Sequence, residues 1–255
     1  MTRVIMHGCN GKMGQTISAL AANDSSVEIV AGVDVTGQGQ NQYPVFASLK
    51  ECDVEADVVI DFSNAAVVQE MMDACEQKGL PVVLCTTGLS EGQLLAVKEA
   101  SKNVAVLRSA NMSLGINVLL KLLKEAAGVF APAGFDIEIV EKHHNQKLDA
   151  PSGTALALAD SINDEMDGAY EYVYDRSQVR QKREKKEIGI SAVRGGTIVG
   201  DHDVIFAGED EVITFSHRAY SKAVFGKGAM EAAKFLAGKP AGMYDMSDVI
   251  EGGTR

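Results

Sequence analysis

The sequence lacks several features that mark particular protein classes. It has no apolar run near the roughly 18 residues that a membrane helix needs, and its four cysteines show no C-x-x-C spacing. We therefore predict no membrane span, no metal site and no redox motif, with cysteines that are reduced and mostly buried. Residues 1–6 lead straight into a strand-like run without the long apolar region of a signal peptide, which favours a cytoplasmic protein.

The chain also has fewer basic than acidic residues. The 24 lysines and arginines are outnumbered by 35 aspartates and glutamates, which gives a formal net charge of −11. A chain this acidic repels nucleic acid and anionic lipid, so neither is an expected partner. The one basic run, residues 180–187, is interrupted by glutamates and is typical of a solvated loop or strand edge. An anionic small molecule stays compatible with this charge if the positive field is local.

A glycine-rich turn lies between the first apolar run and a helical repeat. Gly8, Gly11 and Gly14 follow residues 4–7 with G-x-x-G-x-x-G spacing, a variant of the dinucleotide-binding fingerprint. Such glycines make a tight turn and let a pyrophosphate approach the helix N-terminus. Asp34 ends the next strand about twenty residues after Gly14, where an acid commonly accepts hydrogen bonds from the adenosine ribose. We therefore predict a nicotinamide dinucleotide site.

The residues around Asp34 bear on which dinucleotide is bound. Val35 and Thr36 offer no positive charge to a 2′-phosphate, whereas Lys12 could do so. NADH is therefore favoured, and NADPH is left open.

Apolar runs and helical repeats alternate through the first half of the chain. The runs at residues 57–62, 81–85 and 104–107 are nearly continuous, as strands of a parallel sheet buried on both faces require. The alternation predicts a Rossmann-like, doubly wound α/β fold. Polar stretches follow these strands at 86–88 and 109–112, and ligands of such sheets bind beyond the carboxyl ends of strands. We expect these stretches to join the glycine turn around one cleft.

The second half predicts a smaller α+β domain with a mixed, mostly antiparallel sheet. A long helix follows Ser113, and residues 163–180 are polar and expected to form a mobile excursion. Short glycine-rich links separate the expected strands, which are residues 188–194, 197–200, 203–206 and 211–217. Such a broad sheet could also mediate oligomerisation.

The helical repeat from Gly228 onward is expected to pack back on the first domain. The predicted domains are then residues 1–112 with 222–255 for the dinucleotide, and 113–221 for substrate and oligomerisation. Because the chain would cross between domains twice, we also expect a hinge.

The stretch from Glu141 to Thr154 carries most of the chemistry in the second half. Alternating apolar residues at 135–139 predict a half-buried strand before it, and helical spacing at 155–162 predicts a helix after it. The stretch is therefore expected to form a loop between a strand and a helix, where site residues often lie on a rigid scaffold.

The residue types in this loop indicate an anion site. Pro151 suits the first helical position, which would place Ser152–Thr154 in a first turn whose N–H groups and dipole attract negative charge. Lys147 adds a positive charge, and His143 and His144 can exchange protons near neutral pH. The loop therefore predicts a site for a carboxylate or a phosphate.

Four stretches resemble the dihydrodipicolinate reductase family, namely residues 8–14, 86–88, 109–113 and 141–154. The resemblance covers essentially the whole chain, and the last stretch is its most specific part. It implies a homotetramer built through the sheet of the second domain. It also implies a reductase of the diaminopimelate route to lysine. Such an enzyme transfers hydride from NADH or NADPH to a cyclic dicarboxylated imine, 4-hydroxy-tetrahydrodipicolinate, and gives tetrahydrodipicolinate.

The resemblance also implies roles for individual residues. His143 and Lys147 match the catalytic, proton-handling residues, and His144, Gly153 and Thr154 match the substrate-binding residues. The implied cofactor contacts are Gly8, Cys9, Asn10, Gly11, Lys12, Met13, Asp34, Thr86, Thr87, Gly88, Ser109, Ala110, Asn111 and Met112. Which of His143 and Lys147 gives the proton stays open.

Two positions depart from the family pattern. Met112 stands where the family often has an aromatic residue, so the nicotinamide contact is expected to be softer. Val35 stands where members that favour NADPH often have arginine, in keeping with a preference for NADH.

Two other functions fit parts of the sequence. A different nicotinamide-dependent enzyme, such as a semialdehyde dehydrogenase, would need a catalytic cysteine near the domain boundary, but no cysteine follows Cys85. A dinucleotide-sensing regulator would bind NADH without needing His143 or Lys147, so alanine at these positions would leave its function intact.

Overall fold

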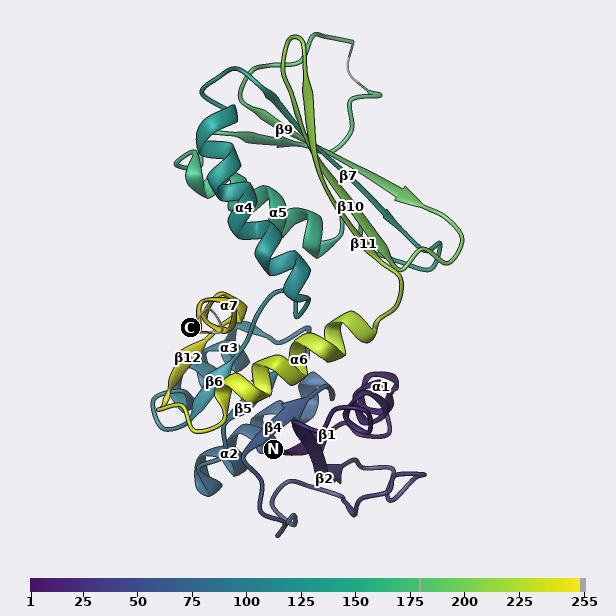
Figure 1. The fold of residues 1–255 in the computed structure, drawn as a ribbon, viewed down its shortest axis with the longest axis vertical. Coiled ribbons are helices and arrows are strands. Elements are labelled where there is room, and N and C mark those ends of the chain that lie inside the picture. The colour runs from purple at the N-terminus through teal and green to yellow at the C-terminus, as the bar shows by residue number, and fades with distance from the viewer. Residues whose placement is uncertain (179, 253–255) are drawn as a thin grey trace. The chain divides into compact units, whose positions relative to one another are not determined.

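The computed structural model describes residues 1–178 and 180–252 (Figure 1). The chain forms two compact units, which are described separately below. Unit 1 combines Met1–Leu114 with the chain from Ala223 onward, and unit 2 is Gly115–Lys222. No described helix is both long and apolar enough to cross a bilayer.

Unit 1 is built on a seven-stranded sheet in the order β12-β6-β5-β4-β1-β2-β3. All of its pairings are parallel, and the order reverses at β1, as in a doubly wound sheet. The predicted Rossmann-like fold is therefore confirmed. The strands are β1 (Thr2–His7), β2 (Val27–Val33), β3 (Val45–Phe46), β4 (Val58–Asp61), β5 (Val82–Leu84), β6 (Ala105–Leu107) and β12 (Gly242–Tyr244).

Helices cover both faces of this sheet, because alternate strand residues enter two different cores. Val4 and Met6 belong to the core with helices α1, α6 and α7, whereas Ile5 belongs to the core with α2 and α3. Burial on both faces explains the continuous apolar strands. The helices are α1 (Lys12–Ala21), α2 (Val68–Lys78) after a 3₁₀ turn (Ala65–Val67), α3 (Glu91–Ala100), α6 (Ala223–Leu236) and α7 (Met246–Gly252).

Helix α6 brings the end of the chain back onto the sheet of unit 1, and it contacts β4, β5 and β6 (Figure 1). A Cβ atom on Gly228 would collide with the backbone oxygen of Met112, so only glycine permits this close approach. The helix begins at Ala223, five residues before the predicted start (228 − 223 = 5), because the apolar repeat already includes Phe225.

Unit 2 is built on a five-stranded sheet in the order β11-β10-β7-β9-β8. Along β7 buried and half-buried residues alternate, and Ile137 and Ile139 pack against Leu123 of α4 and Leu158 of α5. The elements are α4 (Leu114–Phe130), β7 (Asp136–His143), α5 (Gly153–Glu165), β8 (Glu171–Val173), β9 (Glu187–Arg194), β10 (Gly200–Ala207) and β11 (Val212–Ala219).

The structure corrects three predictions for unit 2. The sheet is mixed, but β7 pairs with β9, and β9 with β8, in parallel, so only two of its four pairings are antiparallel. Residues 197–199 form a loop, and a single strand starts at Gly200. The expected excursion at 163–180 contains the end of α5 and strand β8, and its residue 179 lies outside the described residues.

Candidate functional site

The glycine turn of unit 1 is shaped by close backbone packing. Gly8 has a φ of +79°, and a Cβ atom there would lie 2.5 Å from the backbone oxygen of Phe62. A Cβ atom on Gly14 would collide with the backbone oxygen of Gly8. Gly11 precedes α1 without a side-chain cap, so no side chain competes with a ligand for the first N–H groups of the helix. This geometry suits a pyrophosphate.

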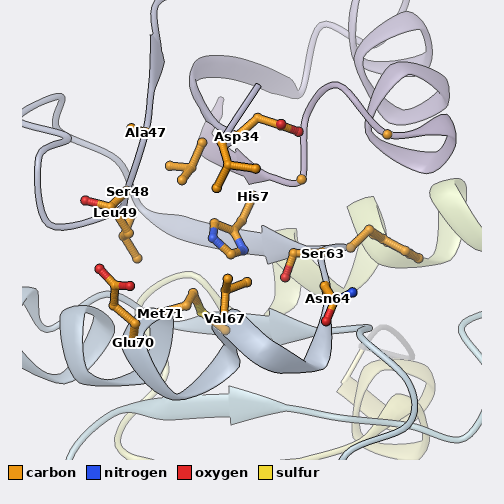
Figure 2. Close-up of a pocket in the computed structure, with 15 residues that line it drawn as sticks. His7, Asp34, Ala47, Ser48, Leu49, Ser63, Asn64, Val67, Glu70 and Met71 are labelled. Carbon is orange, nitrogen blue, oxygen red and sulfur yellow. The ribbon is translucent and has the colours of Figure 1, made fainter. Parts of the chain in front are cut away.

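A cavity of about 310 Å³ opens beside this turn (Figure 2). Leu49, Val67 and Met71 give it an apolar wall, and Gly8 and Asp34 also line it. An apolar slot beside an acid and a glycine turn fits the adenine and ribose of a dinucleotide.

The carboxylate of Asp34 is held in place by neighbouring donors. One oxygen accepts the N–H of Asn10 at 3.0 Å, and the other accepts the N–H and hydroxyl of Thr36 at 3.0 and 2.7 Å. Burial alone would raise the pKa of Asp34, but these hydrogen bonds outweigh it and hold the pKa below its usual value. The charged form that a ribose hydroxyl prefers is therefore maintained.

The other predicted cofactor residues differ in what they can offer. Cys9 is fully buried, and burial raises the pKa of its thiol to about 11, so only its backbone is left for a ligand. Lys12 is exposed at the start of α1, followed by the half-buried Met13. Thr86, after β5, accepts the N–H of Ser63 through its hydroxyl oxygen at 3.0 Å.

The remaining candidates lie just after strands β5 and β6. Thr87 and Gly88 are exposed directly after Thr86. Ser109 is half-buried, Ala110 is exposed, and Asn111 accepts the N–H of Ser113 through its side chain at 2.8 Å. The side chain of Met112 belongs to the core of unit 1 and is only 5% exposed, so its backbone is the part that is left for a cofactor.

In unit 2, the end of β7 and the start of α5 enclose a buried polar cluster centred on Glu141. Its carboxylate is fully buried and accepts hydrogen bonds from four N–H groups. His143 Nδ1 lies 2.6 Å away, Arg194 donates through both terminal nitrogens at 2.8 Å, and the Ser152 N–H donates at 3.0 Å. Burial would raise the pKa of Glu141, but Arg194, His143 and Ser152 outweigh it and lower the pKa.

The Glu141 contact orients the imidazole of His143. Because Nδ1 donates its proton to the carboxylate, Nε2 is the atom that can exchange a proton with a ligand. Gly200 lies beside this atom, and a Cβ atom there would come within 3.0 Å of it. Glycine at this position therefore leaves room around Nε2.

His202 lies next to this cluster and stays neutral. Its Nε2 is 3.1 Å from the hydroxyl of Ser152, and its ring meets that of His143 edge-on, with centroids 5.2 Å apart. Burial, together with the charge of His143, lowers the pKa of His202 to about 4. The cluster thus contains one imidazole that a carboxylate orients and one that stays neutral near neutral pH.

The start of α5 differs from the prediction. Ser152 is the N-cap and accepts the N–H of Ala155 at 3.1 Å, so the helix begins at Gly153 and Pro151 lies outside it, after a cis peptide bond. The strand also extends to His143, so only residues 144–152 form the loop. The prediction that Pro151 opens the helix was wrong because the Ser152 side chain fixes the cap.

This helix N-terminus already holds one carboxylate, that of Asp149. The Lys147 ammonium lies 2.8 Å from it, and Lys147 together with the N–H of Gly153 lowers the pKa of Asp149. Half-buried His144 begins the loop, and half-buried Thr154 lies in the first turn of α5. The predicted residues at 143, 144, 147, 153 and 154 therefore lie along one short segment of unit 2, where Lys147 and Gly153 hold the Asp149 carboxylate.

No role was predicted for Glu141, Arg194 or His202, and Ser152 was predicted only as a residue of the first helical turn. One signal was present, because residues 137, 139, 141 and 143 alternate with half-buried positions, which places Glu141 on the buried face. A buried glutamate needs a cationic partner. Arg194, however, lies 53 residues away, so spacing could not identify it.

The parallel sheet, the glycine turn and the acid at the end of β2 define a nicotinamide-dependent oxidoreductase of Rossmann-like fold. Models of the N-terminal and C-terminal parts of dihydrodipicolinate reductase match residues 2–112 and 115–250. The chain therefore belongs to the dihydrodipicolinate reductase family, as the sequence predicted.

Individual relatives agree with this assignment. A 4-hydroxy-tetrahydrodipicolinate reductase of Caldanaerobacter subterraneus subsp. tengcongensis is 56% identical, over 99% of this chain and 100% of the relative. One from Clostridium tetani is 51% identical, over 98% and 97%. The dipicolinate-bound dihydrodipicolinate reductase from Paenisporosarcina sp. TG-14 is 26% identical, superimposes with a TM-score of 0.80, and is matched over 96% of this chain and 97% of its own.

Proposed function

We propose that this protein reduces 4-hydroxy-tetrahydrodipicolinate to tetrahydrodipicolinate with NADH or NADPH, a step of the diaminopimelate route to lysine. The full-length relatives that bear this activity in their names support the proposal. The observation that carries it is the start of α5, where Lys147 and the Gly153 N–H hold a carboxylate. A dicarboxylated substrate would take the place that the Asp149 side chain fills.

In this proposal the residues of unit 2 bind the substrate and manage a proton. His144, Gly153 and Thr154 hold the substrate carboxylates with Lys147. The reduced nicotinamide, when bound, supplies a hydride. Conversion of the 4-hydroxy imine to tetrahydrodipicolinate takes up this hydride and one proton and releases the 4-hydroxyl group as water, and His143 or Lys147 supplies the proton. Glu141 keeps the His143 proton on Nδ1 in the resting state, so Nε2 can take up the proton that it later gives.

Unit 1 supplies the cofactor site in this proposal. The pyrophosphate lies over the turn from Gly8 to Met13, and Asp34 accepts the ribose hydroxyls. We infer a preference for NADH. The Asp34 carboxylate would repel the 2′-phosphate of NADPH, and Val35 beside it, which is 81% exposed, adds no positive charge to offset this repulsion. Lys12 is the nearest cation in sequence that could offset this repulsion.

A coupled assay tests the reaction and the cofactor together. Aspartate semialdehyde and pyruvate are condensed by the synthase that makes the substrate, and oxidation of NADH or NADPH is followed by absorbance. Oxidation that needs every component supports the proposal, and kcat/KM for the two cofactors tests the preference. A protein that binds NADH but never oxidises it in this assay would contradict the reductase.

The roles of the loop residues need a second experiment. His143→Ala and Lys147→Ala should each lower kcat far more than they weaken NADH binding, because neither residue lies in unit 1. Dipicolinate, a planar cyclic dicarboxylate, should compete with the substrate in the unaltered protein and bind less tightly to Lys147→Ala. Equal losses of turnover and NADH affinity would mean that the loop only maintains the fold.

We also infer a cytoplasmic homotetramer assembled through the sheet of unit 2. Helices α4 and α5 pack on one face of that sheet. On the other face Val193 and Val212 are 45% and 62% exposed, and burial of such apolar side chains would favour association. Light scattering should give four times the mass of the chain, and Val212→Glu should shift it to a smaller species.

A further inference from the structure

His7 lies at the inner end of the cavity in unit 1 and was not among the predicted site residues. It is the last residue of β1, directly before Gly8, and it is 7% exposed. Figure 2 shows its ring between Asp34 and Val67 in the centre of the cavity. Among the described residues that line this cavity, His7 is the only basic one, whereas Asp34 and Glu70 are acids.

The neighbouring strand fixes the orientation of this ring. His7 and Asp61 are partners in the parallel pairing of β1 and β4, and Asp61 Oδ1 lies 2.6 Å from His7 Nδ1. The same oxygen accepts the N–H of Ser63 at 3.2 Å, so the carboxylate cannot turn freely. With Nδ1 engaged, the Nε2 edge of the ring is the part that a ligand can meet.

A purely structural role explains this pair poorly. Asp61 is fully buried, and its Oδ2 has no hydrogen-bond partner among the described residues. Apolar side chains of similar volume at two such positions are often at least as stable as a buried polar pair. His7 Nε2 also has no partner within the described part of the chain, although the ring lines a cavity. Both facts are expected if the pair serves a bound molecule.

We propose that His7 binds the adenosine half of the dinucleotide through a hydrogen bond at Nε2, and that Asp61 is a positioning residue for its ring. The inference rests on the proposed function in one respect, that a nicotinamide dinucleotide lies in this cleft. It adds the contact of a basic side chain to a cavity whose charged lining is otherwise acidic. Since β1 and β4 are adjacent strands of the core sheet, the contact is held on a rigid scaffold.

Binding of cofactor fragments tests the inference. ADP-ribose carries the adenosine half and the pyrophosphate, and reduced nicotinamide mononucleotide carries the other half. In His7→Ala the Kd for ADP-ribose should rise about 5- to 30-fold, as expected for one lost hydrogen bond. The Kd for the nicotinamide fragment should not change. His217→Ala, in unit 2, is the matched control and should leave both values unchanged.

Asp61→Asn separates positioning from direct contact. An asparagine oxygen can still accept the Nδ1 proton, so the loss of ADP-ribose affinity should be smaller than in His7→Ala. Asp61→Ala, which cannot hold the ring, should approach the His7→Ala value. Thermal unfolding without ligand shows whether each variant is folded at the assay temperature.

Nitrogen chemical shifts of the unaltered protein give a test that needs no variant. The His7 Nε2 resonance should move when ADP-ribose is added and stay in place with the nicotinamide fragment. A resonance that ignores ADP-ribose, or a folded His7→Ala with unchanged affinity, overturns the role of His7 and leaves the cofactor site intact. If the unaltered protein does not bind ADP-ribose, both the cofactor site and this inference fail.

Discussion

Replacing Glu141 by glutamine would test how its buried carboxylate controls His143. The two side chains have nearly the same shape, so packing is preserved. The amide oxygen can still accept the Ser152 N–H, but the NH₂ group then faces His143 Nδ1 and one Arg194 nitrogen. Because NH₂ donates, His143 must accept at Nδ1 and carry its proton on Nε2, the opposite of the arrangement in the unaltered protein.

The contacts of Glu141 set the expected size of the change in stability and of the change in turnover. Two hydrogen bonds to a charged group are lost, each worth about 1.5–3 kcal/mol, so the free energy of unfolding should fall by about 3–6 kcal/mol. If His143 transfers the proton, kcat should fall by about 10²- to 10⁴-fold, the usual contribution of a general acid or base. NADH affinity, which depends on unit 1, should not change.

Steady-state kinetics, NADH titration by fluorescence and urea unfolding measure these quantities. Glu125→Gln makes the same chemical change at an exposed position of α4 and should behave like the unaltered protein. A folded Glu141→Gln protein whose kcat falls by less than a factor of about ten would refute proton transfer by a His143 whose tautomer is set by Glu141.

The pH dependence of stability gives an internal check on the same carboxylate. Glu141 has a lowered pKa in the folded state, so its stabilisation is present above the unfolded pKa of about 4.3 and is lost as the pH falls through the folded value. The difference in unfolding free energy between the unaltered protein and Glu141→Gln should therefore shrink below about pH 4.

Three other changes have clear expected outcomes. Gly228→Ala should lower the free energy of unfolding in urea by at least about 2 kcal/mol, because its Cβ collides with Met112. Gly92→Ala in α3 has open space around its Cβ and should raise the free energy of unfolding by up to about 1 kcal/mol. Equal effects of the two substitutions would contradict the packing described for α6. His202 has a folded pKa of about 4, so below the unfolded value of about 6.5 only the unfolded chain takes up its proton, and stability should fall by up to about 3 kcal/mol from pH 6.5 to pH 4. His202→Gln should flatten that slope in unfolding titrations, and a slope that persists would assign it to another group. Val35→Arg should raise the ratio of kcat/KM for NADPH to that for NADH at least about tenfold, and an unchanged ratio would mean that the 2′-phosphate lies elsewhere.

The fold of unit 1 could be predicted because its signals are local. The run from Asp57 to Phe62 is buried on both faces, which leaves a continuous apolar stretch in the sequence. The two-residue strand β3 and the three-residue strand β12 are too short to show any periodicity, and they were missed. In unit 2, the parallel pairing of β7 with β9 depends on contacts between distant segments, so the short glycine-rich link after β9 does not form a hairpin, whereas the link between β10 and β11 does.

In the candidate site too, features with a local sequence signal could be predicted, and contacts between distant segments could not. The glycine turn and the loop with Lys147 stand out as short motifs. The partners that orient them do not, because Arg194 reaches Glu141 from a strand 53 residues away, and His7 meets Asp61 across 54 residues. Such pairs are set by the register of neighbouring strands, which no spacing along the chain reveals.

The position of α6 in the chain has a consequence for how the protein is made. One face of the unit 1 sheet is covered by Ala229, Ala233 and Leu236 of α6, which a ribosome adds only after all of unit 2. The nascent chain must therefore carry that face uncovered while more than a hundred further residues are synthesised (222 − 115 + 1 = 108). Unit 2, a single continuous segment, can fold during this interval. Completion of unit 1 must then close a loop that contains all of unit 2, and such non-local contacts form more slowly than local ones.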